Sequence, residues 1–402
     1  MKNRNIYLDK IIALKDTPEL IKVITGVRRC GKSFLLKLYR DYLNKQGVPA
    51  SSVIYINLED FQYNDIDSAK KLHDFISGKL VKKGITYIFI DEVQLVPSWE
   101  KAVNSLRLNR KNDIYLTGSN AYLLSSNLST LLSGRYVEIK MLPLSFSEFL
   151  QFRDVGEAQD YREHFDLYLK LGGYPGLTEL PDDSDILQDY LFGVFNTIII
   201  KDIVTANRIR DVDVLEKIAR YLSSNIGNIT SARKISNYLI STGRKISADT
   251  ADNYLRMLEN AYCFYRAKRY DLKGKSLMKT NDKFYIVDLG LRNMFRGGVS
   301  SDYGSMLENV VYFELTRKGY TVSVGKYGDL EIDFVAEKSG KLSYFQVAAT
   351  IIPDEVRSRE LKSFRLLGDN YEKTILTMDI VGPYDDIDGI KHQNIIDFLL
   401  RG

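Results

Sequence analysis

The sequence predicts an α/β fold for the N-terminal part of the chain, built on a parallel sheet, with smaller helical and α+β domains after it. Two patterns carry this prediction. An apolar, β-branched run at 20–25 leads into the glycine-rich octet GVRRCGKS at 26–33, and a helical pattern follows. A second apolar run, at 87–90, ends in Asp91 and Glu92. Continuous apolar runs of this kind are typical of strands buried in a parallel sheet.

The octet has the spacing of a phosphate-binding loop. Its two glycines let the backbone wrap closely with N–H groups pointing inward, and the following helix adds the positive end of its dipole. In such a loop the lysine reaches the β- and γ-phosphates, and the hydroxyl residue after it binds Mg²⁺. We therefore expect ATP and Mg²⁺ as ligands, held by Gly26, Val27, Arg28, Arg29, Cys30, Gly31, Lys32, Ser33 and Phe34.

The two carboxylates that end the second run suit metal binding and hydrolysis. Asp91 can hold Mg²⁺ through water, and Glu92 can accept a proton from the attacking water or orient it. Adjacent carboxylates at the end of a buried strand are costly unless a cation is near. The second carboxylate favours the ATPase branch of this fold, whose sheet has an extra strand, over nucleotide kinases.

A third strand and a later arginine complete the candidate site. The run DIYLTGSN at 113–120 ends in Ser119 and Asn120, either of which could touch the γ-phosphate or the attacking water, although TGSN is also an ordinary turn sequence. Arg135, delivered from a neighbouring subunit, would stabilise transition-state charge; a structural arginine is the alternative. The candidate catalytic residues are therefore Glu92, Lys32, Asn120 and Arg135.

The middle of the chain, 206–297, predicts a winged helix. Its pattern is three short helices followed by a two-stranded ribbon, at 214–226, 231–240, 246–263, 263–271 and 283–290. Residues 201–280 hold 16 Lys and Arg against 8 Asp and Glu, which favours DNA as a partner. A winged helix that binds a protein is the alternative. The candidate nucleic-acid contacts are Arg244, Lys245, Arg256, Lys268, Arg269, Lys273 and Lys275.

The last part, 298–402, has the pattern of a small α+β domain of the restriction-endonuclease type. Such nucleases hold Mg²⁺ with Asp and Glu and use a lysine to steady the attacking water. Here Gln346 and Ala348 stand where the second acid and the lysine would be. We therefore expect a degenerate site at Glu308, Asp333 and Gln346 that does not cut. An ATP-regulated, metal-dependent nuclease is the alternative, using the acids that remain: Glu308, Glu331 and Asp333.

Composition favours a cytoplasmic protein. The chain is 45% hydrophobic and has only two cysteines, far apart, so a disulfide scaffold is not expected. No run of about 18 apolar residues predicts a membrane span. The start of the chain lacks the apolar core and cleavage site of a signal peptide.

Together, GVRRCGKS, YIFIDEVQ, YLTGSN and LSGRYVEIKMLPLSFSEFL resemble the AAA-type ATPases of bacteria and archaea that carry a conserved C-terminal domain of unknown function. The resemblance covers nearly the whole chain and implies a P-loop NTPase core with an AAA+-like parallel sheet. It also implies the family's nucleotide and hydrolysis roles for Lys32, Ser33, Asp91 and Glu92. By the same resemblance, Ser119 or Asn120 is the sensor residue that contacts the γ-phosphate or the attacking water, and Arg135 is the candidate arginine finger.

The expected organisation is an ATPase core at 1–160, a helical lid or linker at 161–205, the winged helix at 206–297 and the nuclease-like domain at 298–402. GGYPG at 172–176 is either a hinge or a rigid loop. We expect a homo-oligomer that works as an ATP-dependent switch or motor and engages DNA. A nucleotide-gated adaptor for a protein partner is the alternative.

Overall fold

The structure is a computed structural model, and it describes residues 2, 4–119, 132, 134–156, 161–181, 183–209, 211–278, 281–296, 302–380 and 385–401. The chain divides into two compact units. The first comprises residues 1–143 and 260–262, and the second comprises 144–259 and 263–402. The four-part organisation expected from the sequence is a finer division and stays a prediction.

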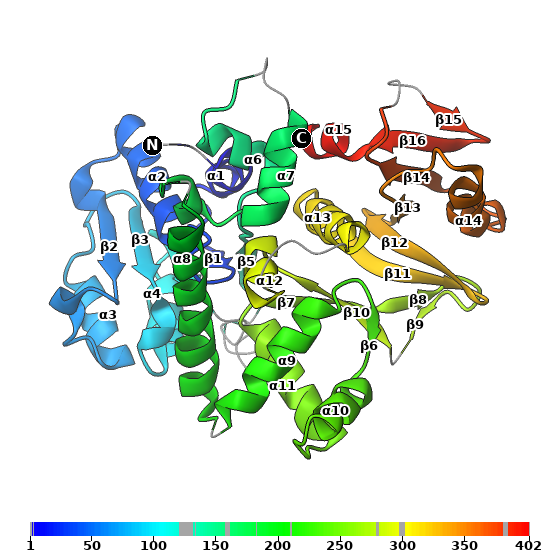
Figure 1. The fold of residues 1–402 in the computed structure, drawn as a ribbon. Coiled ribbons are helices and arrows are strands. Elements are labelled where there is room, and N and C mark those ends of the chain that lie inside the picture. Colours follow the sequence, from blue (N-terminus) through cyan, green and yellow to red (C-terminus); the bar gives the residue numbers. More distant parts are fainter. Residues whose placement is uncertain are drawn as a thin grey trace. The chain divides into compact units, whose positions relative to one another are not determined.

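The first unit is built on a parallel sheet of five strands in the order β2-β3-β4-β1-β5 (Figure 1). The strands are β1 (Ile21–Thr25), β2 (Val53–Asn57), β3 (Thr86–Asp91), β4 (Asn112–Gly118) and β5 (Tyr136–Lys140). The three inner strands are buried along their whole length, as their apolar sequences predicted. Strand β4 lies between β1 and β3 and is the predicted extra strand. Since all strands are parallel, their C-terminal ends meet at one edge of the sheet.

Four α-helices in the described part of this unit accompany the sheet: α1 (Asn5–Ala13), α2 (Lys32–Lys45), α3 (Ala69–Ser77) and α4 (Trp99–Arg107). Helix α1 packs on α2, α3 packs on α4, and both α2 and α4 contact β4. The short segment 260–262 also belongs to this unit. Its Tyr262 is buried in a left-handed conformation with φ 56°, and its hydroxyl donates a hydrogen bond to Glu138 of β5 at 3.4 Å.

A three-stranded antiparallel sheet with three helices forms part of the second unit. The strands lie in the order β6-β10-β7 and span Ile229–Thr230, Asp282–Ile286 and Phe264–Ala267. The helices are α9 (Val212–Ser224), α10 (Ala232–Ser241) and α11 (Ala248–Asn260). Asp211 and Ser231 cap α9 and α10 through their side-chain oxygens, which fixes where these helices begin.

The predicted ribbon of 263–271 and 283–290 is wrong in two places. The first run breaks after Ala267: residues Arg269–Asp271 (β8) leave the three-stranded sheet, pair with β11 of the larger sheet, and turn back into β9 (Ser276–Leu277). The second run ends at Ile286, because Asp288 accepts hydrogen bonds from the amides of Gly290 and Leu291 and starts helix α12 (Leu289–Arg296).

An eight-stranded mixed sheet dominates the C-terminal part of the second unit, in the order β15-β16-β14-β13-β12-β11-β8-β9. Its further strands are β11 (Thr321–Tyr327), β12 (Leu330–Lys338), β13 (Lys341–Val347), β14 (Glu372–Thr377), β15 (Asp386–Ile387) and β16 (Ile390–Asn394). Helices α13 (Tyr303–Arg317), α14 (Asp354–Arg365) and α15 (Ile395–Leu400) pack against it.

The GGYPG segment is held by the carboxylate of Asp288. It follows α6 (Phe146–Phe152) and α7 (Tyr161–Leu171) and precedes α8 (Ser184–Thr197), which runs into a π-helix at Ile198–Thr205. The amide of Gly173 donates to Asp288 Oδ2 at 2.6 Å. Gly172 has φ +81°, and a Cβ there would lie 2.1 Å from Asp288 Oδ1, so only glycine fits. These contacts favour the rigid loop over the hinge.

Asp288 makes the stability of the second unit depend on pH. Burial is the largest effect and raises the pKa of this carboxyl to about 6. Hydrogen bonds from the amides of Gly173, Leu291 and Gly290, and the nearby charge of Arg317, lower the pKa but do not cancel the effect of burial. A carboxyl whose pKa is higher in the folded state stabilises the fold most when protonated, and that stability is lost as pH rises from about 4 through 6. We expect a loss of about 3 kcal/mol in the free energy of unfolding.

The measurement is urea unfolding of the wild type and of Asp288→Asn at several pH values from 4 to 7. The asparagine does not titrate, so the difference in unfolding free energy between the two proteins isolates this carboxyl. We expect the advantage of the wild type to shrink as pH rises. A difference that stays constant with pH would show that Asp288 keeps an ordinary pKa.

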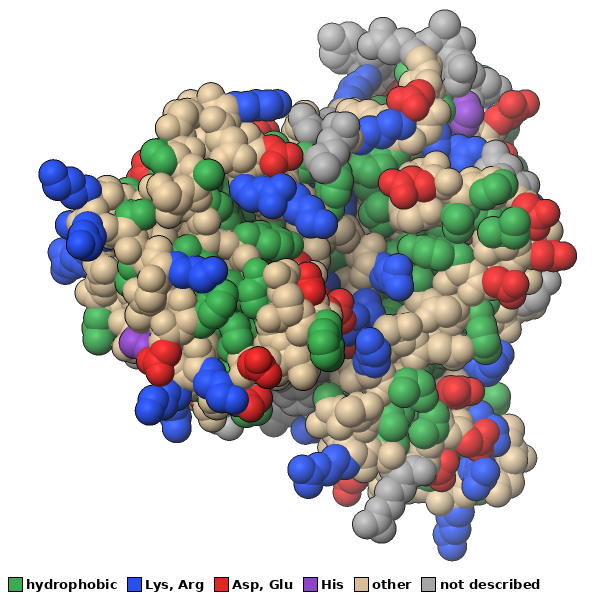
Figure 2. All heavy atoms as spheres, turned by 90° about the vertical axis from the view of Figure 1, so that its left-hand side faces the viewer, with side chains coloured by type: hydrophobic (Ala, Val, Ile, Leu, Met, Phe, Trp, Pro, Cys, Tyr) green, Lys and Arg blue, Asp and Glu red, His purple; other side chains and the backbone are tan. Residues whose placement is uncertain are grey.

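On the face drawn in Figure 2, Lys and Arg side chains lie interspersed with Asp and Glu. The helices in the described ranges include none that has both the length and the apolar character needed to cross a bilayer.

Candidate functional site

The predicted phosphate loop connects the C-terminal end of β1 to helix α2. Gly26 has φ +144°, and a Cβ at this position would lie 2.1 Å from the carbonyl oxygen of Met141, so the loop can close only with glycine here. Gly31 is also left-handed, with φ +103°. Lys32 is 4% exposed, and its Nζ donates to the carbonyls of Gly26 and Val27 at 3.0 and 3.1 Å. The ammonium therefore points into the loop, at the first turn of α2.

A buried arginine supports the loop from beneath. Arg4 is 1% exposed and donates to the carbonyls of Cys30 at 2.9 Å, of Leu142 at 2.9 Å and of Pro143 at 3.3 Å. Cys30 itself is fully buried, and burial raises the pKa of its thiol, as expected for a residue without a redox role. Arg4 thus joins the loop to the chain that follows β5.

Asp91 lies at the end of β3, held by two neighbouring strands. Its Oδ1 accepts a hydrogen bond from the hydroxyl of Thr117 on β4, and its Oδ2 accepts one from the hydroxyl of Tyr55 on β2 at 3.1 Å. The residue is fully buried. Three adjacent strands therefore fix one carboxylate at the C-terminal edge of the sheet.

Glu92 follows in a left-handed conformation, with φ 57°, which is uncommon for a residue other than glycine. Its amide donates to the Thr117 hydroxyl at 2.9 Å, so Thr117 bridges the two acidic residues. The side chain accepts from Gln94 Nε2 and from the Ser119 hydroxyl at 3.4 Å. Both donors bond the same oxygen, Oε2, and together they orient the Glu92 side chain. The other predicted sensor, Asn120, lies outside the described residues.

The remaining residues of the octet differ in exposure. Arg28 forms an ion pair with Glu59 just after β2, at 3.1 Å, whereas Arg29 is exposed with φ 67°. Ser33 and Phe34 begin α2 and are half-buried. Glu59 therefore contacts the phosphate loop through Arg28.

Arg135 lies at the opposite edge of the sheet from the loop. It immediately precedes β5, and its carbonyl accepts from the amide of Ile21, the first residue of β1. The loop leaves the other end of β1, roughly 16 Å away at about 3.3 Å per residue. The exposed guanidinium lines a pocket of about 380 Å³ with Glu19, Arg107 and Arg110. Arg135 therefore faces away from the phosphate loop of its own chain.

Sequence reasoning missed four residues that shape this site: Arg4, Tyr55, Gln94 and Thr117. Thr117 stands in the same strand end as Ser119, so its place was visible, but its bridging role depends on the register of β3 and β4. Arg4 and Tyr55 reach the site from distant segments, and no motif marks them.

The basic candidates of the middle segment are divided among several elements. Arg244 pairs with Asp213 at 2.9 Å, and Arg256 pairs with Asp252 at 2.5 Å, one turn earlier on α11. Lys245 precedes α11 and is exposed. The other four belong to the segment between β7 and β9, where Arg269 is half-buried and Lys268, Lys273 and Lys275 are exposed. The structure thus separates the predicted DNA-contacting set into two groups.

The acidic residues of the nuclease-like pattern do come together in the second unit. Glu308 lies on α13, and Glu331 and Asp333 lie on β12. Gln346 on β13 accepts from the amide of Asp333 at 3.3 Å and donates to Glu360 at 3.0 Å. Burial, with the nearby Glu308 carboxylate, raises the pKa of Asp333. The structure therefore brings these residues together around a cation that the sequence pattern did not indicate, described below.

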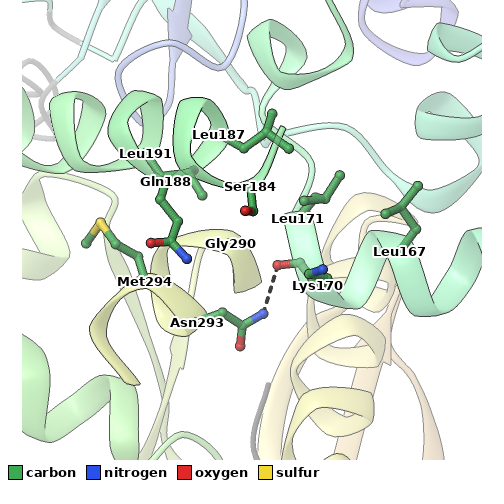
Figure 3. A pocket seen from close by; sticks show the side chains of 10 residues that line it. All are labelled: Leu167, Lys170, Leu171, Ser184, Leu187, Gln188, Leu191, Gly290, Asn293 and Met294. Carbon is green, nitrogen blue, oxygen red and sulfur yellow. Dashed lines mark hydrogen bonds between the residues drawn. The ribbon is translucent and has the colours of Figure 1, made fainter. Parts of the chain in front are cut away.

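A separate pocket of about 210 Å³ lies between α7, α8 and α12 (Figure 3). Four leucines and Met294 form the apolar part of its wall, and Asn293 Nδ2 donates to the carbonyl of Lys170 at 2.9 Å. Among its described lining residues only Lys170 is charged, so the pocket holds no acid–base pair.

Residues 18–150 match the family model of an AAA domain, and residues 162–302 match a domain of unknown function, DUF8612. An uncharacterized protein of Haemophilus influenzae is 42% identical over 406 residues, covering 100% of this chain and 99% of that protein. An uncharacterized protein of Methanocaldococcus jannaschii is 31% identical, covering 93% of this chain and 86% of its own.

A Walker-type ATPase of Pyrococcus abyssi is similar in fold, with a TM-score of 0.50 and 18% identity over 74% of this chain and 96% of that chain. The expected α/β fold with an AAA-type phosphate-loop domain is thereby confirmed. The chain belongs to the same family as the Haemophilus influenzae and Methanocaldococcus jannaschii proteins, and it carries an AAA domain followed by the DUF8612 domain.

Proposed function

We propose that the first unit binds ATP with Mg²⁺ and hydrolyses it. The observation that carries this proposal is the position of two buried carboxylates, Asp91 and Glu92, bridged by Thr117 at the sheet edge where the phosphate loop also lies. Ligands of parallel sheets bind at this edge. Lys32 would reach the β- and γ-phosphates, and the amides at the start of α2 would bind anionic oxygens.

The donors at this edge suit Mg²⁺. The ion prefers oxygen ligands and usually binds through one or two protein groups, phosphate oxygens and water. The Ser33 hydroxyl and the Asp91 carboxylate supply such groups. Glu92, oriented by Gln94 and Ser119, is placed as the base for water. Mg²⁺ would neutralise the charge that develops on the phosphates.

We further propose that Arg135 acts on the nucleotide of a neighbouring subunit, in a homo-oligomer. Its place at the far edge of the sheet supports this, since it cannot reach the loop of its own chain. Mixing Arg135→Ala with Lys32→Ala protein tests the idea. Each variant should be nearly inactive alone, and the mixture should recover activity where an intact Arg135 faces an intact loop. A mixture as inactive as its components would contradict it.

DNA is the partner we propose for the second unit, through a winged helix at 206–297. The order of three helices and a small antiparallel sheet supports this, with α11 as the helix for the major groove. The nuclease-like domain at 298–402 would then be a scaffold without cutting activity. A protein-binding adaptor is the second candidate, and the pairing of Arg244 and Arg256 with acidic residues favours it, since these pairs reduce the free positive charge.

The deciding experiment is the steady-state ATPase rate with Mg²⁺, with and without double-stranded or single-stranded DNA. Lys32→Ala serves as the blank. Stimulation by DNA that weakens steeply with salt supports the DNA proposal. A rate that DNA leaves unchanged favours a protein partner. A rate that does not exceed that of the blank would overturn the proposal that the protein hydrolyses ATP.

A further inference from the structure

A buried lysine from outside the nuclease-like pattern lies at the centre of its acidic cluster. Lys283 is the second residue of β10, and its side chain is 3% exposed. Its Nζ lies 2.9 Å from Glu308 Oε1, 2.8 Å from Glu331 Oε1 and 3.7 Å from Asp333 Oδ1. One ammonium therefore faces three carboxylates, two of them within 3 Å.

The backbone that carries this lysine is fixed. Strand β10 is the middle strand of its sheet, where Lys283 is paired with Ile229 on one side and with Ala267 on the other. Two residues along, on the same face of the strand, Tyr285 donates its hydroxyl to the same Glu308 oxygen at 2.5 Å. The ammonium and the hydroxyl thus approach α13 together from a rigid strand.

The surrounding groups stabilise the charged lysine. Although burial alone would lower it, the carboxylates of Glu308, Asp333 and Glu331 raise the pKa of Lys283 above its usual range. Asp333 Oδ2 is engaged by the amide of Val347 at 2.9 Å. Gln346, where an acid would provide a further ligand, is turned to Glu360 instead. One oxygen of each carboxylate is therefore directed at the lysine, and the second oxygen of Asp333 is already bonded.

We propose that the Lys283 ammonium takes the place of a divalent cation in this cluster, as an internal counterion that joins β10 to α13 and β12. The resemblance to metal-dependent nucleases implies a metal here, and the residues present do not fit one. Three carboxylates that converge in a buried place require a cation. The chain supplies that cation itself and so excludes the metal ion.

Manganese binding to nucleotide-free protein, followed by the electron paramagnetic resonance of free Mn²⁺, tests this. Lys283→Met keeps the length of the side chain and removes its charge. We expect it to gain one Mn²⁺ per chain, at least about tenfold tighter than any site of the wild type. The double variant Lys283→Met with Glu331→Gln should lose the ion again. Lys275→Met, at an exposed lysine, is the matched control and should gain nothing.

Two outcomes would overturn the proposal. One is a wild-type protein that binds a Mn²⁺ ion which Glu331→Gln loses, because the ammonium would then not exclude the metal. The other is a Lys283→Met protein that is folded by circular dichroism and gains no Mn²⁺. If Lys283→Met does not fold, the comparison of the wild type with Glu331→Gln decides alone, and equal Mn²⁺ binding by these two supports the proposal.

Discussion

Replacing Glu92 by glutamine is expected to lower the rate of ATP hydrolysis by at least about 100-fold while leaving the affinity for ATP nearly unchanged. The amide is close in shape to the carboxylate and can still accept a hydrogen bond from Gln94 or Ser119, but it cannot take a proton from water. The phosphate loop and Asp91, which would hold the nucleotide and its metal, are not altered. The variant should therefore bind ATP and keep it.

The measurements are single-turnover hydrolysis and the binding of a fluorescent ATP analogue. Glu100→Gln on α4 is the matched control, since it removes a carboxylate of the same unit outside the proposed site. Hydrolysis at the wild-type rate would remove Glu92 from the proposed mechanism. Loss of ATP binding together with hydrolysis would assign Glu92 a structural role.

Removing the charge of Lys22 is expected to destabilise the first unit by about 3–5 kcal/mol. Lys22 on β1 and Asp113 on β4 form an ion pair whose side chains are fully buried. Burial lowers the pKa of Lys22 and raises the pKa of Asp113, so desolvation outweighs their attraction for each partner. With methionine at position 22, Asp113 would keep a buried charge supported only by the amide of Asp16 and the hydroxyl of Tyr115.

Thermal unfolding followed by circular dichroism measures this, and a drop of about 10 °C in the midpoint is expected for Lys22→Met. Adding Asp113→Asn removes the uncompensated charge and should recover part of the loss. Lys45→Met, at an exposed position at the end of α2, should change the midpoint little. If the double variant is as unstable as the sum of its two single changes, the charge pair is not the cause.

The arrangement of the phosphate loop and the two acids could be predicted because it follows from local rules. A glycine-rich octet needs a strand before it and a helix after it, and two acids after an apolar run mark the end of a strand. The left-handed φ of Glu92 and the bridge by Thr117 depend on strand register, which the sequence does not state. Arg4 is 26 residues from Cys30, and nothing in its own sequence indicates that it would be buried beneath the loop.

Long-range pairing also explains the misplaced strand and the missed lysine. Residues 264–271 have the sequence pattern of one strand, yet β7 and β8 belong to different sheets. The reason is that β8 pairs with β11, which lies more than fifty residues later in the chain. Helices α12 and α13 and strand β11 separate Lys283 from Glu331 along the chain, so no spacing rule connects them. The absence of a lysine at position 348 was visible in the sequence, but the approach of Lys283 from β10 to the acidic cluster was not.

The grouping of residues 260–262 with the first unit has a consequence for how this chain can be divided or exchanged in evolution. A fragment that ends at Pro143 contains the phosphate loop, Asp91, Glu92 and Arg135, yet it lacks Tyr262 and the hydrogen bond that this residue gives to Glu138. The two units are therefore interleaved along the sequence, not joined end to end. An N-terminal half transferred alone would lose its contact with Tyr262. This loss is a physical reason for relatives to inherit the whole chain together.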